Sequence, residues 1–170
     1  MLLDTSFVVE ALIPTQRHHE PSRRFLEDLA VGGTTVVFSR LLEVELAEAS
    51  FRIGLKELHR RDWATARLDG RSRRRGRARM LAVLAAWEAT LAALDWARIE
   101  VQEVVSRVRD LMGSYGLSSY DAVHAATALD TGIHDLVTLD SGFAALPPRS
   151  MRLLVDSSRV RRCRQIRSGP

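Results

Sequence analysis

Short apolar, strand-like runs alternate with helical segments along this chain, and this alternation limits its fold more than any other feature. The runs expected as strands are 1–3, 35–38, 98–101, 136–139 and 151–155. Between them, helical spacing of apolar residues predicts helices over 7–12, 19–29, 40–53, 55–69, 78–94, 103–115 and 120–129. Strands that alternate with helices favour a three-layer α/β/α fold around a central, mostly parallel sheet.

The length and composition are those of one globular domain. The chain has 170 residues, of which 46% are hydrophobic, which is enough for one core but not for two. We expect a single domain over 1–156, with an inserted helical hairpin over about 55–95. The remaining segment, 157–170, is predicted to be a basic tail whose composition is typical of disorder.

The positive charge is concentrated in two arginine-rich segments. Six of the 25 basic residues lie in 71–79 and five in 159–167, which leaves 14 basic residues against 21 acidic ones in the rest of the chain. Such clusters attract phosphate groups directly, although an arginine run can also be no more than a solvated loop. The candidates in the first segment, expected as a loop between two helices, are Arg71, Arg73, Arg74, Arg75, Arg77 and Arg79.

Several protein classes are disfavoured. No apolar run approaches the roughly 18–20 residues that a membrane span needs, and the start of the sequence lacks the basic region of a signal peptide. The single cysteine, Cys163, can form neither an internal disulfide nor a cysteine-based zinc site. A reducing cytoplasm is the expected location.

Three aspartates are candidates for one site at the edge of the predicted sheet. Asp4 and Asp140 each follow a strand, and Asp121 lies in the first turn of its helix. Because the carboxyl ends of parallel strands and the starts of the following helices meet at one edge, we expect these acids to lie close together. Each also has a structural explanation as a helix cap, a capping-box acid or a turn residue.

Glu45 is harder to explain by structure alone. It lies about two turns into its helix, on the same face as Leu41, Leu42 and Ala49, whereas Glu43 lies on another face. An inward-facing glutamate needs a partner or a cation. Carboxylates that converge on one edge repel one another unless a divalent metal ion lies among them.

Four stretches of the sequence resemble the sequence blocks of PIN-domain nucleases, and most closely those of VapC-type toxins of bacterial toxin–antitoxin pairs. The stretches are LLDTSFVVEAL, SRLLEVEL, GLSSYDAVHAATAL and LVTLDSGF. The resemblance covers residue 1 to about 48 and 117 to 143. It implies a Mg²⁺- or Mn²⁺-dependent ribonuclease of PIN-like fold, in which the metal activates water for hydrolysis of an RNA phosphodiester bond.

The resemblance also assigns roles to residues. Those that it places in metal binding and catalysis are Asp4, Glu45, Asp121 and Asp140, and it places Ser6 and Thr138 as small polar residues beside the metal. Gly142 stands where many relatives carry another acid, so the sequence is compatible with one metal ion or two. His124 is expected to pack or hydrogen-bond near this edge, because metal-activated hydrolysis does not require a histidine base.

The implied partners are RNA, a cognate antitoxin protein and a second copy of the chain in a homodimer, with no membrane. A role in RNA processing is an alternative to the toxin role. Two other classes stay open: an α/β domain that handles phosphoryl groups, and a non-catalytic binding module that uses the arginine loop. The first lacks a well-placed lysine, since Lys56 is the only one, and the second would not need four converging acids.

Overall fold

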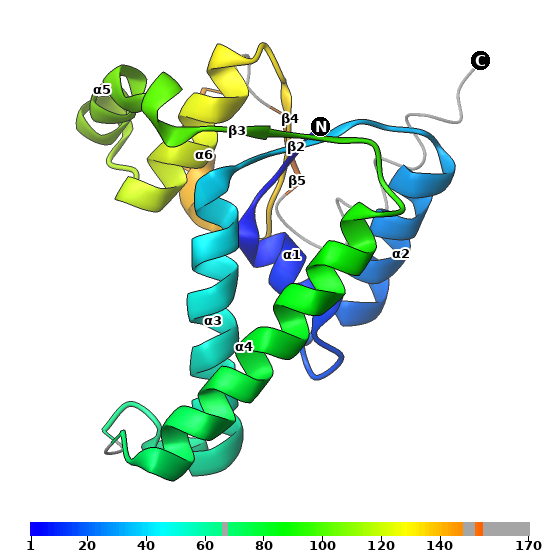
Figure 1. The fold of residues 1–170 in the computed structure, drawn as a ribbon. Coiled ribbons are helices and arrows are strands. Elements are labelled where there is room, and N and C mark those ends of the chain that lie inside the picture. Colours follow the sequence, from blue (N-terminus) through cyan, green and yellow to red (C-terminus); the bar gives the residue numbers. More distant parts are fainter. Residues whose placement is uncertain (66–67, 148–151, 155–170) are drawn as a thin grey trace.

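The computed structural model describes residues 1–65, 68–147 and 152–154 and confirms the α/β fold (Figure 1). The strands are β1 (Leu2–Leu3), β2 (Val36–Ser39), β3 (Trp96–Ile99), β4 (Asp135–Val137) and β5 (Arg152–Leu154). The α-helices are α1 (Thr5–Leu12), α2 (His19–Val31), α3 (Arg40–His59), α4 (Gly70–Leu91), α5 (Val105–Tyr115) and α6 (Ser119–Asp130). Short 3-10 helices span Arg60–Asp62, Val101–Glu103 and Ser141–Ala145.

The five strands form one parallel sheet in the order β3-β2-β1-β4-β5. β1 is central, with Leu2 opposite Val37 on one side and Leu136 on the other. Because all the strands run in one direction, their carboxyl ends lie at one edge of the sheet. The residues that follow β1, β2 and β4 are therefore brought together there.

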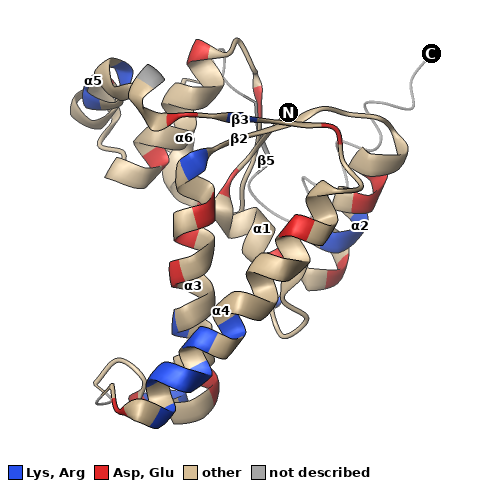
Figure 2. Cartoon of the chain, viewed as in Figure 1, with Lys and Arg blue, Asp and Glu red and all other residues tan. Residues whose placement is uncertain are grey.

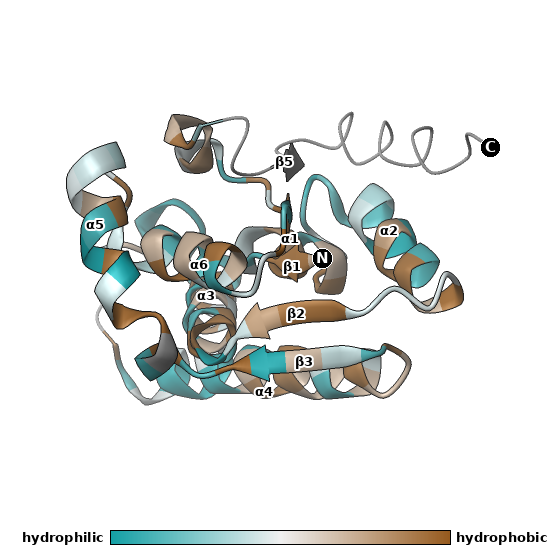
Figure 3. Cartoon of the chain, turned by 90° about the horizontal axis from the view of Figure 1, so that it is seen from above, coloured by the Kyte–Doolittle hydropathy of each residue, from teal (hydrophilic) through white to brown (hydrophobic). Residues whose placement is uncertain are grey.

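Both faces of the sheet are covered, which gives the three predicted layers. Successive residues of a strand point to opposite faces, and here Leu3, Phe38 and Val137 pack into one core cluster with residues of α1, α2 and α4. Leu2 and Leu136 pack into a second cluster with residues of α5 and α6. Figure 3 shows α2 on one side of the strands, α5 and α6 on the other, and mostly hydrophobic residues in β2. This two-sided burial explains why β1 and β2 have no polar alternation, whereas the edge strand β3 is largely exposed.

The prediction of a separate helix over 55–69 and of an arginine loop after it is wrong. α3 continues without a break to His59, and α4 begins at Gly70, so the arginines of 71–79 lie in the first half of a helix. Asp69 caps this helix by accepting a hydrogen bond from the Ser72 amide at 2.7 Å. Arginine is a good helix former, so a dense run of arginines is compatible with a helix. The hairpin is therefore formed by α3 and α4 themselves.

Two glycines allow α3 and α4 to cross closely. A Cβ atom on Gly76 would lie 2.6 Å from the Phe51 ring, and a Cβ on Gly54 would lie 3.0 Å from the backbone of Gly76. His59 Nε2 and Ser72 Oγ, 2.8 Å apart, join the helices at their far end. Gly54 therefore marks a packing contact inside α3, and the helix does not end beside it as the sequence had suggested.

Other boundaries differ by one or two residues. β3 begins and ends two residues before the predicted 98–101, and β4 ends at Val137, so Thr138 lies just beyond the strand. The predicted basic tail over 157–170 lies outside the described residues. Within the described part of the chain, no helix combines the length and apolar character that crossing a membrane requires.

Candidate active site

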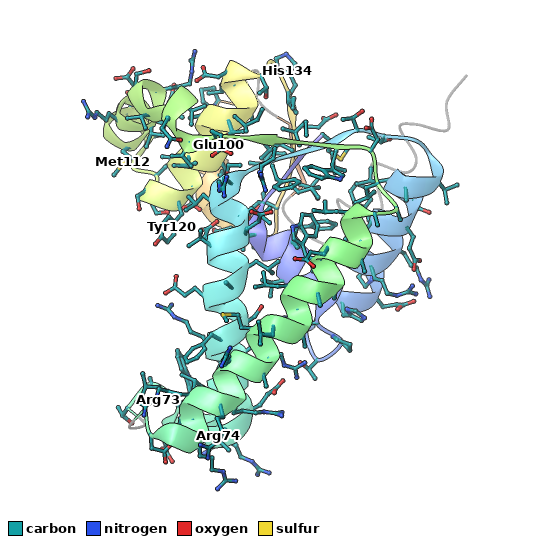
Figure 4. The ribbon with its side chains drawn as sticks, in the orientation of Figure 1. Arg73, Arg74, Glu100, Met112, Tyr120 and His134 are labelled. Atoms are coloured by element: carbon teal, nitrogen blue, oxygen red, sulfur yellow. The ribbon has the colours of Figure 1, made fainter. Side chains whose placement is uncertain are left out.

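The four predicted acids line a single cleft at the carboxyl edge of the sheet. A cavity of about 420 Å³ is bordered by Asp4, Glu45, Asp121 and Asp140, and we call it the acidic cleft. Thr5, Ser6 and Tyr120 also line it, and Tyr120 stands at the start of α6 (Figure 4). The expectation that acids from distant parts of the sequence meet at this edge is confirmed for all four residues.

Asp4 is the most buried of these acids, with only 3% of its surface exposed. It directly follows β1 and caps α1, and its Oδ2 atom accepts hydrogen bonds from the Ser6 hydroxyl at 2.5 Å and the Thr138 hydroxyl at 2.7 Å. Its structural role as a cap and its place in the acidic cleft are therefore combined in one side chain. The two hydroxyls fix the orientation of the carboxylate.

Ser6 and Thr138 also hold the loop that follows β4. The Leu139 amide donates to Ser6 Oγ at 2.9 Å, and the Asp140 amide donates to Thr138 Oγ1 at 2.9 Å. Asp140 Oδ1 in turn accepts a hydrogen bond from the Gly142 amide at 2.7 Å. The two small polar residues thus connect Asp4 to Asp140, which are 136 positions apart in the sequence.

Glu45 is held from the other side of the cleft. Its Oε2 atom accepts hydrogen bonds from the Thr5 hydroxyl at 2.6 Å and from His124 Nε2 at 2.6 Å. The side chain of Glu45 is 15% exposed and that of His124 is fully buried. The prediction that His124 packs and hydrogen-bonds near this edge is confirmed. The hydrogen bond of Thr5 to Glu45 is not predicted from the sequence, although the position of Thr5 between Asp4 and Ser6 points to a place in the site.

Glu43 does not belong to the cleft. It pairs at 3.4 Å with Arg98, which lies on β3. The helical phase that separates Glu45 from Glu43 is therefore as predicted. One glutamate of α3 faces the acidic cleft, and the other forms a partly exposed ion pair on a different face.

Asp121 lies in the first turn of α6, where the Ser118 hydroxyl donates to its Oδ2 atom at 2.8 Å. Its pKa is raised, first by partial burial and then by the negative charges of Asp140 and Asp4, although the Ser118 hydrogen bond acts in the opposite direction. Repulsion from the neighbouring carboxylates therefore adds to the effect of burial on this pKa. A cation among them would relieve that repulsion.

The pKa of His124 is also raised. Burial alone would lower it, but the hydrogen bond to Glu45 and the negative charges of Asp4, Glu45 and Asp121 outweigh the effect of burial. The surrounding acids thus favour a positive charge on this ring more strongly than burial disfavours it. Its Nε2 atom also lies 3.6 Å from Asp4 Oδ1.

Each of the four carboxylates has one oxygen that accepts hydrogen bonds from the described residues and one that accepts none. The first kind are Asp4 Oδ2, Glu45 Oε2, Asp121 Oδ2 and Asp140 Oδ1. This leaves Asp4 Oδ1, Glu45 Oε1, Asp121 Oδ1 and Asp140 Oδ2 available as ligands. One oxygen fixes each side chain, and the other can bind a hard divalent cation such as Mg²⁺ or Mn²⁺.

The donor set fits a cation that keeps part of its water shell. Among residues 1–65, 68–147 and 152–154, no three Asp, Glu, His or Cys side chains are placed so that they could hold one metal ion together. Mg²⁺ usually keeps several waters and takes only one or two carboxylates as direct ligands. A Cβ on Gly142 would lie 3.2 Å from Asp140 Oδ1 and 3.4 Å from Asp121 Oδ2, so a larger side chain there would extend between these two acids.

The arginines of the first half of α4 have different environments. Arg75 and Arg79 both pair with Glu57 of α3, and Arg73 donates to the Leu68 carbonyl at 2.8 Å. In contrast, the side chains of Arg71, Arg74 and Arg77 are exposed and have no hydrogen bond or ion pair within the described residues. None of the six lines the acidic cleft. Figure 4 shows Arg73 and Arg74 at the far end of the α3–α4 pair, away from Tyr120.

Sequence reasoning did not identify every residue of the cleft. Glu10 and Glu48 also line it, and so does Arg52, which pairs with Glu48 at 2.6 Å. These side chains face the cleft only because α1 packs beside α3. No sequence motif marks that contact.

Comparison with known protein families gives a match over most of the chain. The family model described as the PIN domain matches residues 1–147. No curated protein matches the chain significantly. The matched range includes all four carboxylates of the acidic cleft, both hydroxyl residues that hold Asp4, and the α3–α4 pair.

Proposed function

The chain belongs to the PIN-domain family, and we propose on this basis that it is a metal-dependent ribonuclease that hydrolyses RNA phosphodiester bonds. Members of the family are generally nucleases that use divalent metal ions. The observation that carries the proposal is the acidic cleft, in which each of four carboxylates has one oxygen that accepts no hydrogen bond from the described residues. A non-catalytic binding module would gain nothing from this arrangement, because repulsion among the acids costs stability.

In this proposal, Asp4, Asp121 and Asp140 hold Mg²⁺ or Mn²⁺, directly or through water, and Glu45 holds the metal or a water beside it. When bound, the metal supplies a Lewis acid that polarises the scissile phosphate and lowers the pKa of water. The Ser6 and Thr138 hydroxyls keep Asp4 in one orientation. Such supporting hydrogen bonds are commonly worth 10–100-fold in metal affinity or activity.

His124 and Thr5 have the corresponding role for Glu45. They donate to the same oxygen, Oε2, so the other oxygen keeps a fixed position at the cleft. A positive charge on His124, which the raised pKa favours, would also reduce the net negative charge that an approaching phosphate meets. It is a positioning residue in this proposal, because it is fully buried behind the carboxylates.

We also propose that the protein is the toxin of a toxin–antitoxin pair and that it acts as a homodimer controlled by an antitoxin protein. The resemblance of four sequence blocks to VapC-type toxins supports this role. The arginines exposed on α4 are proposed to bind RNA outside the cleft. The alternative biological role, RNA processing, uses the same chemistry and differs only in the consequence for the cell.

The chemical part is tested by incubating the purified protein with labelled RNA and, separately, with single-stranded DNA, in Mg²⁺, in Mn²⁺ and in EDTA. We expect RNA cleavage that requires a metal ion and that falls by at least about 100-fold in Asp4→Asn. Circular dichroism should show that this variant is folded. Asp130→Asn, which removes the partner of Arg107 far from the cleft, is the matched control and should cleave normally.

Full RNase activity in Asp4→Asn would overturn the assignment of the site. Cleavage of DNA alone would overturn RNA as the substrate but would leave the nuclease activity itself supported. Expression in a bacterial host then separates the two biological roles, because a toxin should arrest growth with RNA cleavage and Asp4→Asn should be harmless. Growth without arrest would favour RNA processing.

A further inference from the structure

A second cavity adjoins the acidic cleft. It has a volume of about 580 Å³ and shares Val9, Ala49 and Arg52 with the cleft, so the two are continuous along α3. Lys56 and Glu57 also line it, and we call it the basic groove. Arg52 and Lys56 are the cations among the described residues that line either cavity.

The two cations continue the face of α3 that carries Glu45. With 3.6 residues per turn, positions seven and eleven residues after Glu45 point in nearly the same direction as Glu45 itself. Arg52 and Lys56 occupy these positions and lie roughly 10 and 16 Å further along the helix axis at 1.5 Å per residue. One helix face therefore leads from an acid of the site to two positive charges.

The charges around the groove leave it positive. Glu57 lines it, but both Arg75 and Arg79 of α4 pair with this carboxylate. The Lys56 ammonium lies 4.6 Å from the centre of the Trp63 ring, which holds it by a cation–π contact without neutralising it. Arg52 pairs with Glu48, but both side chains are about half exposed, and such a surface pair exchanges readily because it is worth little.

We propose that the basic groove holds the phosphate backbone of single-stranded RNA beside the bond that is cut, with Arg52 and Lys56 as phosphate contacts. This inference rests on the ribonuclease function proposed above. Phosphate contacts fix the register of a nucleic acid without reading its sequence, and the groove would deliver the next phosphate of the same strand to the acidic cleft. An acidic protein segment could meet the same two cations, but it offers no phosphate to a metal ion in the cleft.

The test is the salt dependence of RNA binding. Fluorescence anisotropy with a fluorescein-labelled single-stranded RNA of mixed sequence is measured in EDTA, so that the RNA stays intact. Arg52→Gln and Lys56→Gln should each make the slope of log K against log salt shallower by about 0.7, and the double variant by about 1.4, since each single-strand phosphate contact contributes about that amount. Arg109→Ala, an exposed arginine of α5 without a partner in the described residues, is the control and should leave the slope unchanged.

Two further measurements sharpen the result. Glu48→Gln removes the competing carboxylate from Arg52 and should tighten RNA binding several-fold. In Mg²⁺ or Mn²⁺, the double variant should raise KM with little change in kcat, because these residues bind the strand equally in the ground and transition states.

An unchanged slope in the double variant would overturn the inference. The inference would also be overturned if the double variant lost binding to a labelled polyglutamate peptide but kept its binding to RNA. The groove would then be a site for an acidic protein. Failure of the ribonuclease function gives a different pattern: the wild type would not cleave RNA in any metal, while the slope would still respond to Arg52 and Lys56.

Discussion

The acidic cleft and the arginine-rich first half of α4 have opposite charge and are built in opposite ways. Figure 2 shows the second region as a cluster of basic residues at the far end of the α3–α4 pair. The cleft takes its acids from α3, α6 and the residues after β1 and β4, and each is fixed by a hydrogen bond. The arginines come from one helix, and the side chains of Arg71, Arg74 and Arg77 are fixed by nothing in the described part of the chain.

This difference matches what each kind of chemistry requires. A metal ion needs oxygens at defined positions, so its ligands must be oriented by tertiary contacts. Attraction of a polyanion depends mainly on the number of charges and only weakly on their geometry. The same comparison separates Arg75 and Arg79 from the other arginines, because they neutralise Glu57 and join α4 to α3.

Beyond the loss expected for Asp4→Asn, the largest effect should come from exchanging glutamates on α3. Glu45→Gln should lower metal-dependent RNase activity by roughly 10–100-fold, because the amide can still accept from Thr5 and His124 but no longer carries a charge for the metal. Glu43→Gln changes charge on the same helix but only breaks an ion pair with Arg98, so activity should stay within about two-fold of wild type. Steady-state kinetics on both variants checks this. Equal reductions would mean that charge on α3, and not the position of Glu45, supports activity.

The four acids of the cleft could be predicted because their positions follow from local rules. Asp4 and Asp140 follow strands, and Asp121 begins a helix after a serine cap. In a parallel sheet these positions meet at one edge whatever the details of packing. The inward face of Glu45 followed from helical periodicity alone.

The contacts that hold the acids could not be predicted in the same way. The bond between His124 and Glu45 joins residues 79 positions apart, and it depends on how α6 packs against α3. The role of Arg52 depends on the contact between α1 and α3. The charge of the arginine segment favours a loop, whereas the helix propensity of arginine and the cap at Asp69 favour the helix that forms.

A smaller effect, on stability, should follow from changing the crossing of α3 and α4. Gly76→Ala places a Cβ 2.6 Å from the Phe51 ring, which is overpacked and should lower the free energy of unfolding by about 1–3 kcal/mol. Gly113→Ala is the matched control on α5, because no atom lies within 4 Å of the added Cβ. That change should raise stability by about 0.4–1 kcal/mol through the entropy of the unfolded chain. Urea denaturation of both variants measures the difference.

The two glycine variants also test how far the two regions depend on each other. If Gly76→Ala is folded at the assay temperature, it should retain metal-dependent cleavage, because none of the carboxylates contacts this crossing. If Gly113→Ala lost as much stability as Gly76→Ala, any added methyl group would be harmful. The loss in Gly76→Ala could then not be attributed to close packing of α3 and α4.

The smallest effect is expected from the exposed arginines. Arg71, Arg74 and Arg77 lie on the side of α4 away from Ser72 and Gly76, the buried residues that face α3. If they bind RNA, they do so beyond the basic groove, so replacing all three with alanine should weaken binding only for RNA long enough to extend past the groove. For long RNA, the log–log salt slope should become shallower by about 0.7 for each phosphate that these arginines no longer neutralise, whereas kcat should not change.

A variant with Arg24, Arg107 and Arg109 replaced removes the same charge from α2 and α5 and should have no effect on the slope. Equal changes in both triple variants would mean that RNA responds only to net charge, and an unchanged slope in both would leave the first half of α4 as a solvated surface.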